Sequence, residues 1–104
     1  MKLLTKELLE RFEQVGSQEE VGDPLVIAKF FNPTGAGTWY ATEYEPGSKC
    51  FFGYVSIFGD HNDEWGWFSL EELEAYNGAF GLGIERDLYF PEQPISQVVV
   101  TQAE

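Results

Sequence analysis

Extended apolar segments that alternate with clusters of turn-forming residues constrain the fold of this chain more than any other feature. The clearest segment is 38–45, in which Trp39, Ala41 and Glu43 are expected on one face of a strand and Tyr44 on the other. Residues rich in Pro, Gly, Asn and Ser separate the segments, and short connections of this kind favour antiparallel neighbours. The sequence therefore predicts four strands in chain order, at residues 25–31, 38–45, 49–58 and 64–68.

Two short helices are predicted outside this region. Thr5 can cap a first helix through about residue 15, because apolar side chains recur there at spacings of three and four. Ser69 and Glu72 match a capping box, which predicts a second helix to about Tyr76. We therefore expect an α+β fold with a four-stranded, mainly antiparallel sheet and two short helices.

The C-terminal third is less regular. Residues 78–83 form a glycine-rich loop after the second helix, and 84–90 are expected to be extended. Residues 95–100 have strand-like composition, although Ser96 after Pro94 could also begin a helical turn.

The charge limits the partners. The chain has 104 residues, near the commonest size of one domain, so residues 1–104 are assigned to a single domain. Its 18 Asp and Glu against 6 Lys and Arg give a net charge of −12. Such a field repels nucleic acid and anionic membranes and attracts basic surfaces. We expect no direct binding of nucleic acid or membrane, whereas a basic protein partner stays open.

Residues with catalytic or metal-binding potential are few. The single histidine, His61, lies in a polar turn, and the single Cys50 lies in an apolar run, where a buried reduced thiol typical of a cytoplasmic protein is expected. Asp60, Asn62 and Glu64 resemble the start of a calcium loop, but the glycine that such a loop needs is Trp65. We expect no metal, no cofactor and no enzyme activity, with a solvated acidic turn at these residues.

An alternative function would depend on paired carboxylates. Glu43 on one strand could face Glu85 or Asp87 on a later one, as glycoside hydrolysis requires, or Arg86 could form a structural ion pair with Glu43. The alternative function is thus a small-ligand module or a carboxylate-based hydrolase, with a pocket that gathers Trp39, Glu43 and Arg86.

Aromatic residues are unusually dense on the predicted strands. They make up 16% of the chain, and two short helices can cover only one face of a sheet. The surplus predicts either an exposed aromatic patch, which would be a protein interface or a groove for a planar ligand, or a core that buries all of these rings.

Several segments in order resemble a bacterial family of unknown function, domain of unknown function 2958: residues 1–5, Met-Lys-Leu-Leu-Thr; 39–43, Trp-Tyr-Ala-Thr-Glu; 51–53, Phe-Phe-Gly; 68–73, Phe-Ser-Leu-Glu-Glu-Leu; and 84–90, Ile-Glu-Arg-Asp-Leu-Tyr-Phe. The resemblance covers nearly the whole chain. It implies no established activity, but a setting on plasmids, phages and integrative elements.

That setting and the charge together suggest an accessory protein that binds a basic host or defence protein, as an inhibitor or as a mimic of the phosphates of nucleic acid. The alternative is that the acidic residues are only solvated faces. The carboxylates expected to take part in mimicry are Glu7, Glu10, Glu13, Glu71, Glu72, Glu74, Asp60, Asp63 and Glu64. The candidate binding residues overall are Trp39, Glu43, Asp60, Asp63, Glu64, Glu71, Glu72, Glu85, Arg86 and Asp87.

Overall fold

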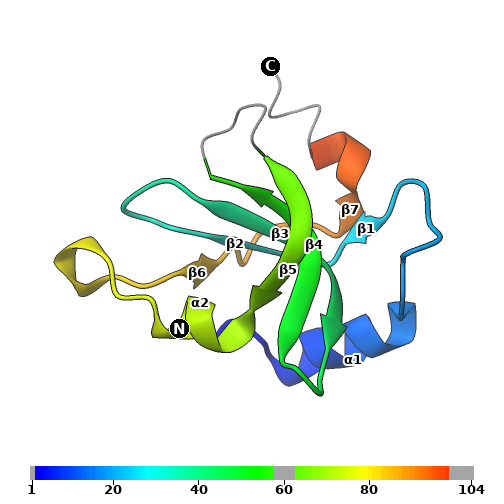
Figure 1. Ribbon diagram of the computed structural model, residues 1–104, viewed down its shortest axis with the longest axis horizontal. Helices are drawn as coiled ribbons and strands as arrows, with labels where there is room; N and C mark the ends of the chain where they lie inside the picture. Colours follow the sequence, from blue (N-terminus) through cyan, green and yellow to red (C-terminus); the bar gives the residue numbers. More distant parts are fainter. Residues whose placement is uncertain (1, 58–62, 99–104) are drawn as a thin grey trace.

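The structure, a computed structural model, describes residues 2–57 and 63–98. Its strands form a five-stranded antiparallel sheet in the order β5-β4-β3-β2-β6 and a two-stranded sheet of β1 and β7 (Figure 1). The elements are α1 (Lys6–Val15), β1 (Leu25–Val26), β2 (Ala28–Phe31), β3 (Thr38–Glu45), β4 (Cys50–Ser56), β5 (Glu64–Ser69), α2 (Leu70–Ala75), the 3-10 turn η1 (Ala79–Gly81), β6 (Glu85–Arg86) and β7 (Gln93–Pro94).

The chain is α+β, as the sequence predicts, but the prediction of four strands is wrong because the main sheet has five. The additional strand β6 pairs with β2, so that Phe30 lies opposite Arg86. A two-residue strand shows no alternation in the sequence, and its pairing depends on distant residues. The predicted strand 25–31 also divides at Ile27, because β1 leaves the main sheet to pair with β7.

Both predicted helices are confirmed, together with their caps. The Thr5 side chain accepts a hydrogen bond from the Leu8 amide at the start of α1. Gly16 ends α1 with a φ of 68°, a conformation that favours glycine. Ser69 Oγ accepts from the Glu72 amide at 3.2 Å and caps α2. Residues 95–98 are helical, so the helical alternative for the tail is the one observed.

The main core lies between the sheet and the two helices, which lie in the lower part of Figure 1. Its centre is Phe51, which is fully buried. The Phe51 ring lies 5.7 Å from Phe12 of α1, 5.1 Å from Phe30, 5.0 Å from Tyr44 and 5.5 Å from Phe68, centroid to centroid. Ring packing of this kind fixes α1 over the middle strands.

The opposite face of the sheet is covered only in part. A smaller cluster of Val26, Tyr40, Ile95 and Val98 places the helical residues 95–98 over one region of this face. Tyr54 of β4 packs against this cluster, whereas Trp65 and Trp67 of β5 on the same face are exposed. This uncovered region of the sheet is where the candidate site lies.

A β-bulge in β3 decides which side chains reach the uncovered face. Ala41 lies opposite Gly53 and Glu43 lies opposite Phe52, so Thr42 is the extra residue between them. The predicted face assignment is therefore wrong beyond Ala41, because Glu43 moves to the face of Phe52 while Tyr44 joins the main core. A bulge depends on the partner strand, and simple alternation along one strand does not contain it.

Candidate binding site

Four rings of β4 and β5 form a row on the uncovered face, which we call the aromatic face: Phe52, Tyr54, Trp65 and Trp67. Phe52 stacks on Trp65 at 5.9 Å and meets Trp67 edge-on at 5.2 Å, while Tyr54 meets Trp65 edge-on at 5.6 Å. Trp65 is 41% and Trp67 57% exposed. The rings thus support one another, but the outer two present large apolar surfaces to solvent.

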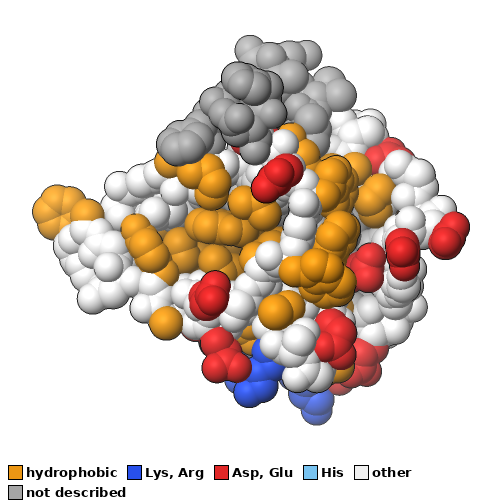
Figure 2. Space-filling view, viewed as in Figure 1, with side chains coloured by type: hydrophobic (Ala, Val, Ile, Leu, Met, Phe, Trp, Pro, Cys, Tyr) orange, Lys and Arg blue, Asp and Glu red, His pale blue; other side chains and the backbone are white. Residues whose placement is uncertain are grey.

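Hydrophobic side chains gather over β4 and β5 in Figure 2, with Asp and Glu side chains around them. This is the arrangement that the surplus of aromatic residues predicted as one of two possibilities. The other possibility, a core that buries every ring, is wrong for Trp65 and Trp67.

A hollow of about 440 Å³ lies between the aromatic face and the loop that follows α1. We call it the aromatic hollow. The described residues that line it include two acids, Glu19 and Glu43, and no Lys or Arg. Its lining consists of Gln18, Glu19, Val21, Gly22, Pro24, Thr42, Glu43, Phe52, Trp65 and Trp67.

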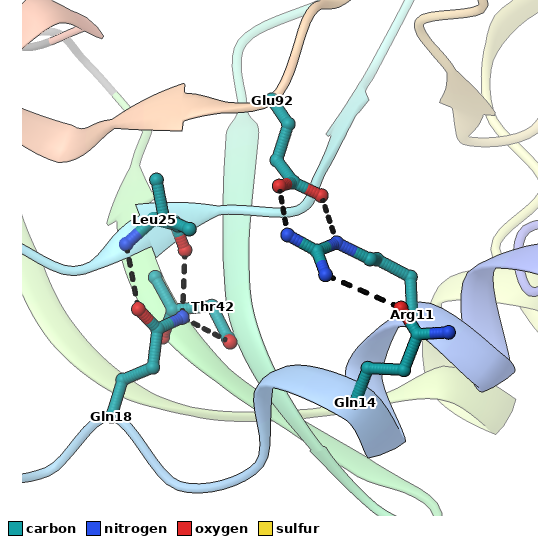
Figure 3. Close-up of polar contacts among 6 residues, drawn as sticks. All are labelled: Arg11, Gln14, Gln18, Leu25, Thr42 and Glu92. Atoms are coloured by element: carbon teal, nitrogen blue, oxygen red, sulfur yellow. Dashed lines mark hydrogen bonds and ion pairs between the residues drawn. The ribbon is translucent and has the colours of Figure 1, made fainter.

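Gln18 fixes the loop that forms one wall of this hollow (Figure 3). Its side chain is buried, and its Nε2 donates to the carbonyl oxygens of Leu25 and Thr42, both at 2.8 Å. Its Oε1 accepts from the Leu25 amide at 2.7 Å. One amide side chain therefore ties the loop to β1 and to the bulge of β3, which holds the wall in place without regular secondary structure.

The bulge forms the opposite wall. The Thr42 hydroxyl donates to the Phe52 carbonyl at 3.1 Å, while the Thr42 carbonyl accepts from Gln18. These bonds provide partners for the hydroxyl and the carbonyl of the extra residue, and Glu43 beside it is half-buried in the lining of the hollow. The carboxylate is positioned by the register shift rather than by strand alternation.

A second polar contact secures the C-terminal side of the fold. Arg11 of α1 makes a two-pronged ion pair with Glu92, with Nε to Oε1 at 2.8 Å and an amino nitrogen to Oε2 at 2.7 Å (Figure 3). Hydrogen bonding to Glu92, then its charge, raises the pKa of Arg11. Because this pair links α1 to the residues before β7, it is structural.

The three residues of the predicted alternative pocket do not come together. Glu43 lines the aromatic hollow, Trp39 lines a hollow beside α2 on the other face, and Arg86 lines a third hollow near Thr5. Arg86 donates to the carbonyl oxygens of Lys2 and Leu3 at 3.1 and 3.3 Å. The interpretation of Glu43 and Arg86 as one site, whether ion pair or hydrolase, therefore has no geometric support.

The two acids beside Arg86 have separate surroundings. Asp87 lies 3.7 Å from Lys29 as an ion pair, and its other oxygen accepts from the Tyr89 amide. Glu85 lies opposite Phe31 in the pairing of β6 with β2. Because β2 lies between β3 and β6 in the main sheet, Glu43 and Glu85 are not on adjacent strands and do not face each other as a catalytic pair.

Of the predicted acids in and after the turn before β5, the structure describes Asp63 and Glu64 but not Asp60. Asp60 and Asn62, which resemble the first ligands of a calcium loop, lie outside the described residues. Asp63 is half-buried. Burial, followed by the charge of Asp63, raises the pKa of Tyr54 on the aromatic face. Glu64 is exposed at the start of β5. Within the described residues, no group of three or more His, Cys, Asp and Glu could hold a metal ion.

The helical acids lie away from the aromatic face. Glu71 and Glu72 are exposed on α2, and Glu71 lies 3.8 Å from Lys49. Glu74 accepts a hydrogen bond from the Leu3 amide, so it holds the N-terminal residues against α2. Glu7, Glu10 and Glu13 are exposed on α1. Cys50 is half-buried, not fully buried as expected.

Sequence reasoning missed the loop residues of the site, above all Gln18 and Glu19. They lie in a polar stretch without a period, so no local signal marks them. Trp65 and Trp67 could be predicted to lie together, since their spacing of two places both rings on one face of a strand. Phe52 lies opposite Trp67 on that face.

Together, the fold and the site define a small α+β protein with an uncovered aromatic face and the aromatic hollow beside it. The chain belongs to the family described as protein of unknown function DUF2958, whose family model matches residues 3–104. A search of the curated proteins and a search of the solved structures found no match. Among the described residues, no helix is long and apolar enough to cross a membrane.

Proposed function

We propose that this protein is a non-catalytic accessory protein that binds a basic protein partner through the aromatic face and the aromatic hollow. The observation that carries the proposal is the exposure of Trp65 and Trp67 beside Glu19 and Glu43. Indole rings supply a large contact area at a low cost in side-chain entropy, and they attract Lys and Arg through their π faces. The carboxylates complete a surface suited to basic side chains.

The net charge of −12 supports the same proposal. A field of this sign increases the rate of encounter with basic surfaces and repels phosphate backbones. In this proposal the partner is a basic host or defence protein in a bacterial cytoplasm, met by a protein encoded on a mobile element. Inhibition follows if the bound acidic protein covers the surface that the partner uses for nucleic acid.

A small organic cation is the second candidate ligand. The aromatic hollow has a volume of about 440 Å³, within the range of roughly 300–1,000 Å³ of small-ligand pockets. Its rings and carboxylates would hold a quaternary ammonium or guanidinium group. Titration with tetramethylammonium and with arginine methyl ester, followed by tryptophan fluorescence, separates this candidate from the first, because a protein interface needs far more contact area than either cation offers.

The primary experiment captures a partner with matched baits. Wild-type protein, the double variant Trp65→Ala/Trp67→Ala, and Glu13→Gln as a surface control are immobilised and exposed to bacterial lysate at low salt. Because central tryptophans each contribute about 2 kcal/mol or more to an interface, the double variant should lose the partner. The control removes one exposed charge on α1, away from the aromatic face. Because Glu13 is also one of the acids expected from the sequence to take part in mimicry, loss of the partner by this bait would assign binding to the acids of α1 instead.

The expected result is one stoichiometric basic protein on the wild-type and Glu13→Gln baits, released as rising salt screens the contact, and absent from the double variant. Retention of that protein by the double variant would contradict the assignment of the aromatic face. Failure of every bait to retain a basic partner would contradict the proposed function itself.

A further inference from the structure

Strand β5 ends the main sheet, and its outer edge is open. The strand order places β5 beside β4 alone among the described residues (Figure 1). Natural edge strands are usually protected by Lys, Pro, bulges or shortness. The six residues Glu64–Ser69 contain no Lys and no Pro, and their register with β4 runs without a shift. This edge therefore lacks the usual protection against an added strand.

The backbone groups on the open edge belong to the two exposed tryptophans. The Leu70 amide donates to the Lys49 carbonyl, which continues the pairing of β5 with β4. In an antiparallel pair, residues bond alternately to the inner and the outer neighbour. Counting back from Leu70, Phe68 and Gly66 bond inward, so the N–H and C=O groups of Trp65 and Trp67 point outward.

Apolar hollows flank this edge on both faces of the sheet. The aromatic hollow lies on one face. A second hollow of about 330 Å³, which we call the edge hollow, includes Trp39, Val55 and Phe68 from the other face. Hydrophobic side chains lie on both sides of the β5 backbone in Figure 2. A Cβ atom added at Gly66 would meet nothing within 4 Å, so the space above the strand is open.

We propose that an extended, basic segment of the partner adds to the outer edge of β5 as a sixth strand. This proposal rests on the proposed function and specifies how the partner binds. Main-chain hydrogen bonds to Trp65 and Trp67 would hold the segment, and its alternate side chains would enter the two hollows.

The charge around the edge selects the occupant. Glu64 lines the edge hollow, and Glu19 and Glu43 line the aromatic hollow. Lys or Arg on the added strand would pair with Glu64 of the adjacent strand β5, while Glu19 and Glu43, further across the aromatic face, add to the negative field that attracts a basic segment. A second copy of this chain is disfavoured, because two molecules of net charge −12 repel each other.

Amide hydrogen exchange tests the proposal on the intact protein. The probe is an acetylated eight-residue peptide of alternating lysine and valine, added to ¹⁵N-labelled wild-type protein. Strand addition should slow exchange of the Trp65 and Trp67 amides by about tenfold or more, because they become hydrogen-bonded. The Gly66 and Phe68 amides, which already bond to β4, should change little.

Proline provides the matched variant. Trp67→Ala and Trp67→Pro both remove the indole ring, but only the proline removes the outward N–H, and an edge strand tolerates proline at such a position. Peptide affinity should fall a further roughly tenfold from Ala to Pro. Equal affinities of the two variants would overturn strand addition. Circular dichroism checks that Trp67→Pro is folded. The exchange measurement on wild-type protein gives an independent result.

The outcomes separate the two proposals. Peptide binding without protection of the Trp65 and Trp67 amides would overturn strand addition and leave the binding face intact. Absence of saturable peptide binding would overturn strand addition alone, because the capture experiment with the Trp65→Ala/Trp67→Ala bait tests the binding face separately. Protection in the free protein that grows with its concentration, together with a dimer mass in ultracentrifugation, would overturn the basic occupant in favour of a second copy.

Discussion

At the scale of single residues, two glycines on facing strands have opposite roles. Gly53 lies next to the bulge, and a Cβ atom there would come 1.9 Å from the Tyr40 carbonyl oxygen, closer than atoms can approach. Gly66 lies opposite Gly53 on β5, where an added Cβ meets nothing within 4 Å. Glycine is thus required by close backbone approach at the first position and not at the second.

Substitution by alanine should separate these roles. Gly53→Ala should lower the free energy of unfolding by about 3 kcal/mol or more, because backbone atoms of β3 must shift to make room. Gly66→Ala, the control, should keep or raise stability by up to about 1 kcal/mol, since alanine lowers the entropy cost of ordering the strand. Urea denaturation of both variants measures the difference. Equal stabilities would contradict the close approach.

At the scale of elements, local signals predicted what depends on local residues. Thr5 and Ser69 mark the starts of α1 and α2, and the alternation in 38–45 gives the bounds of β3 as observed. Strand β6 lies within residues 84–90, which were expected to be extended. Its pairing in the sheet, and strand β7 altogether, were missed because these pairings depend on β2 and β1, far away in the chain. The candidate site divides in the same way. The spacing of the rings predicts that Trp65 and Trp67 share a face, but no local signal predicts the loop beside them.

The loop after α1 is an element without a period, and Gln18 replaces regular hydrogen bonding there. Gln18→Ala would leave the Leu25 amide and the Thr42 carbonyl without this partner. Because unpaired buried polar groups are expensive, the free energy of unfolding should fall by about 2–4 kcal/mol. The wall of the aromatic hollow should loosen as well.

Gln14→Ala is the matched control, since Gln14 is exposed and only accepts from Arg11 at 3.3 Å. Its effect should stay within about 0.5 kcal/mol. Thermal unfolding and exchange of the Leu25 amide report on the two variants. If Gln18→Ala proves as stable as Gln14→Ala, the loop is held by other contacts.

At the scale of the whole molecule, the incomplete coverage of one sheet face and the net charge both bear on what the protein can bind. The sheet has one face packed against α1 and α2, while residues 95–98 cover only part of the other. Exposed apolar area of this kind is a liability in a monomer unless it serves an interface. In the proposed function, the net charge of −12 disfavours self-association and attracts basic partners. The extent to which this face is covered could not be predicted from the sequence, because it depends on where residues 95–98 pack.

The most direct measurement is calorimetric titration of the captured, purified partner into wild-type protein, the Trp65→Ala/Trp67→Ala variant and Glu13→Gln. Since central tryptophans dominate interface energies, the double variant should bind about 30-fold more weakly or worse, and Glu13→Gln should bind like wild type. Affinity should also fall as salt rises. Unchanged affinity of the double variant would contradict the central claim that the aromatic face binds the partner.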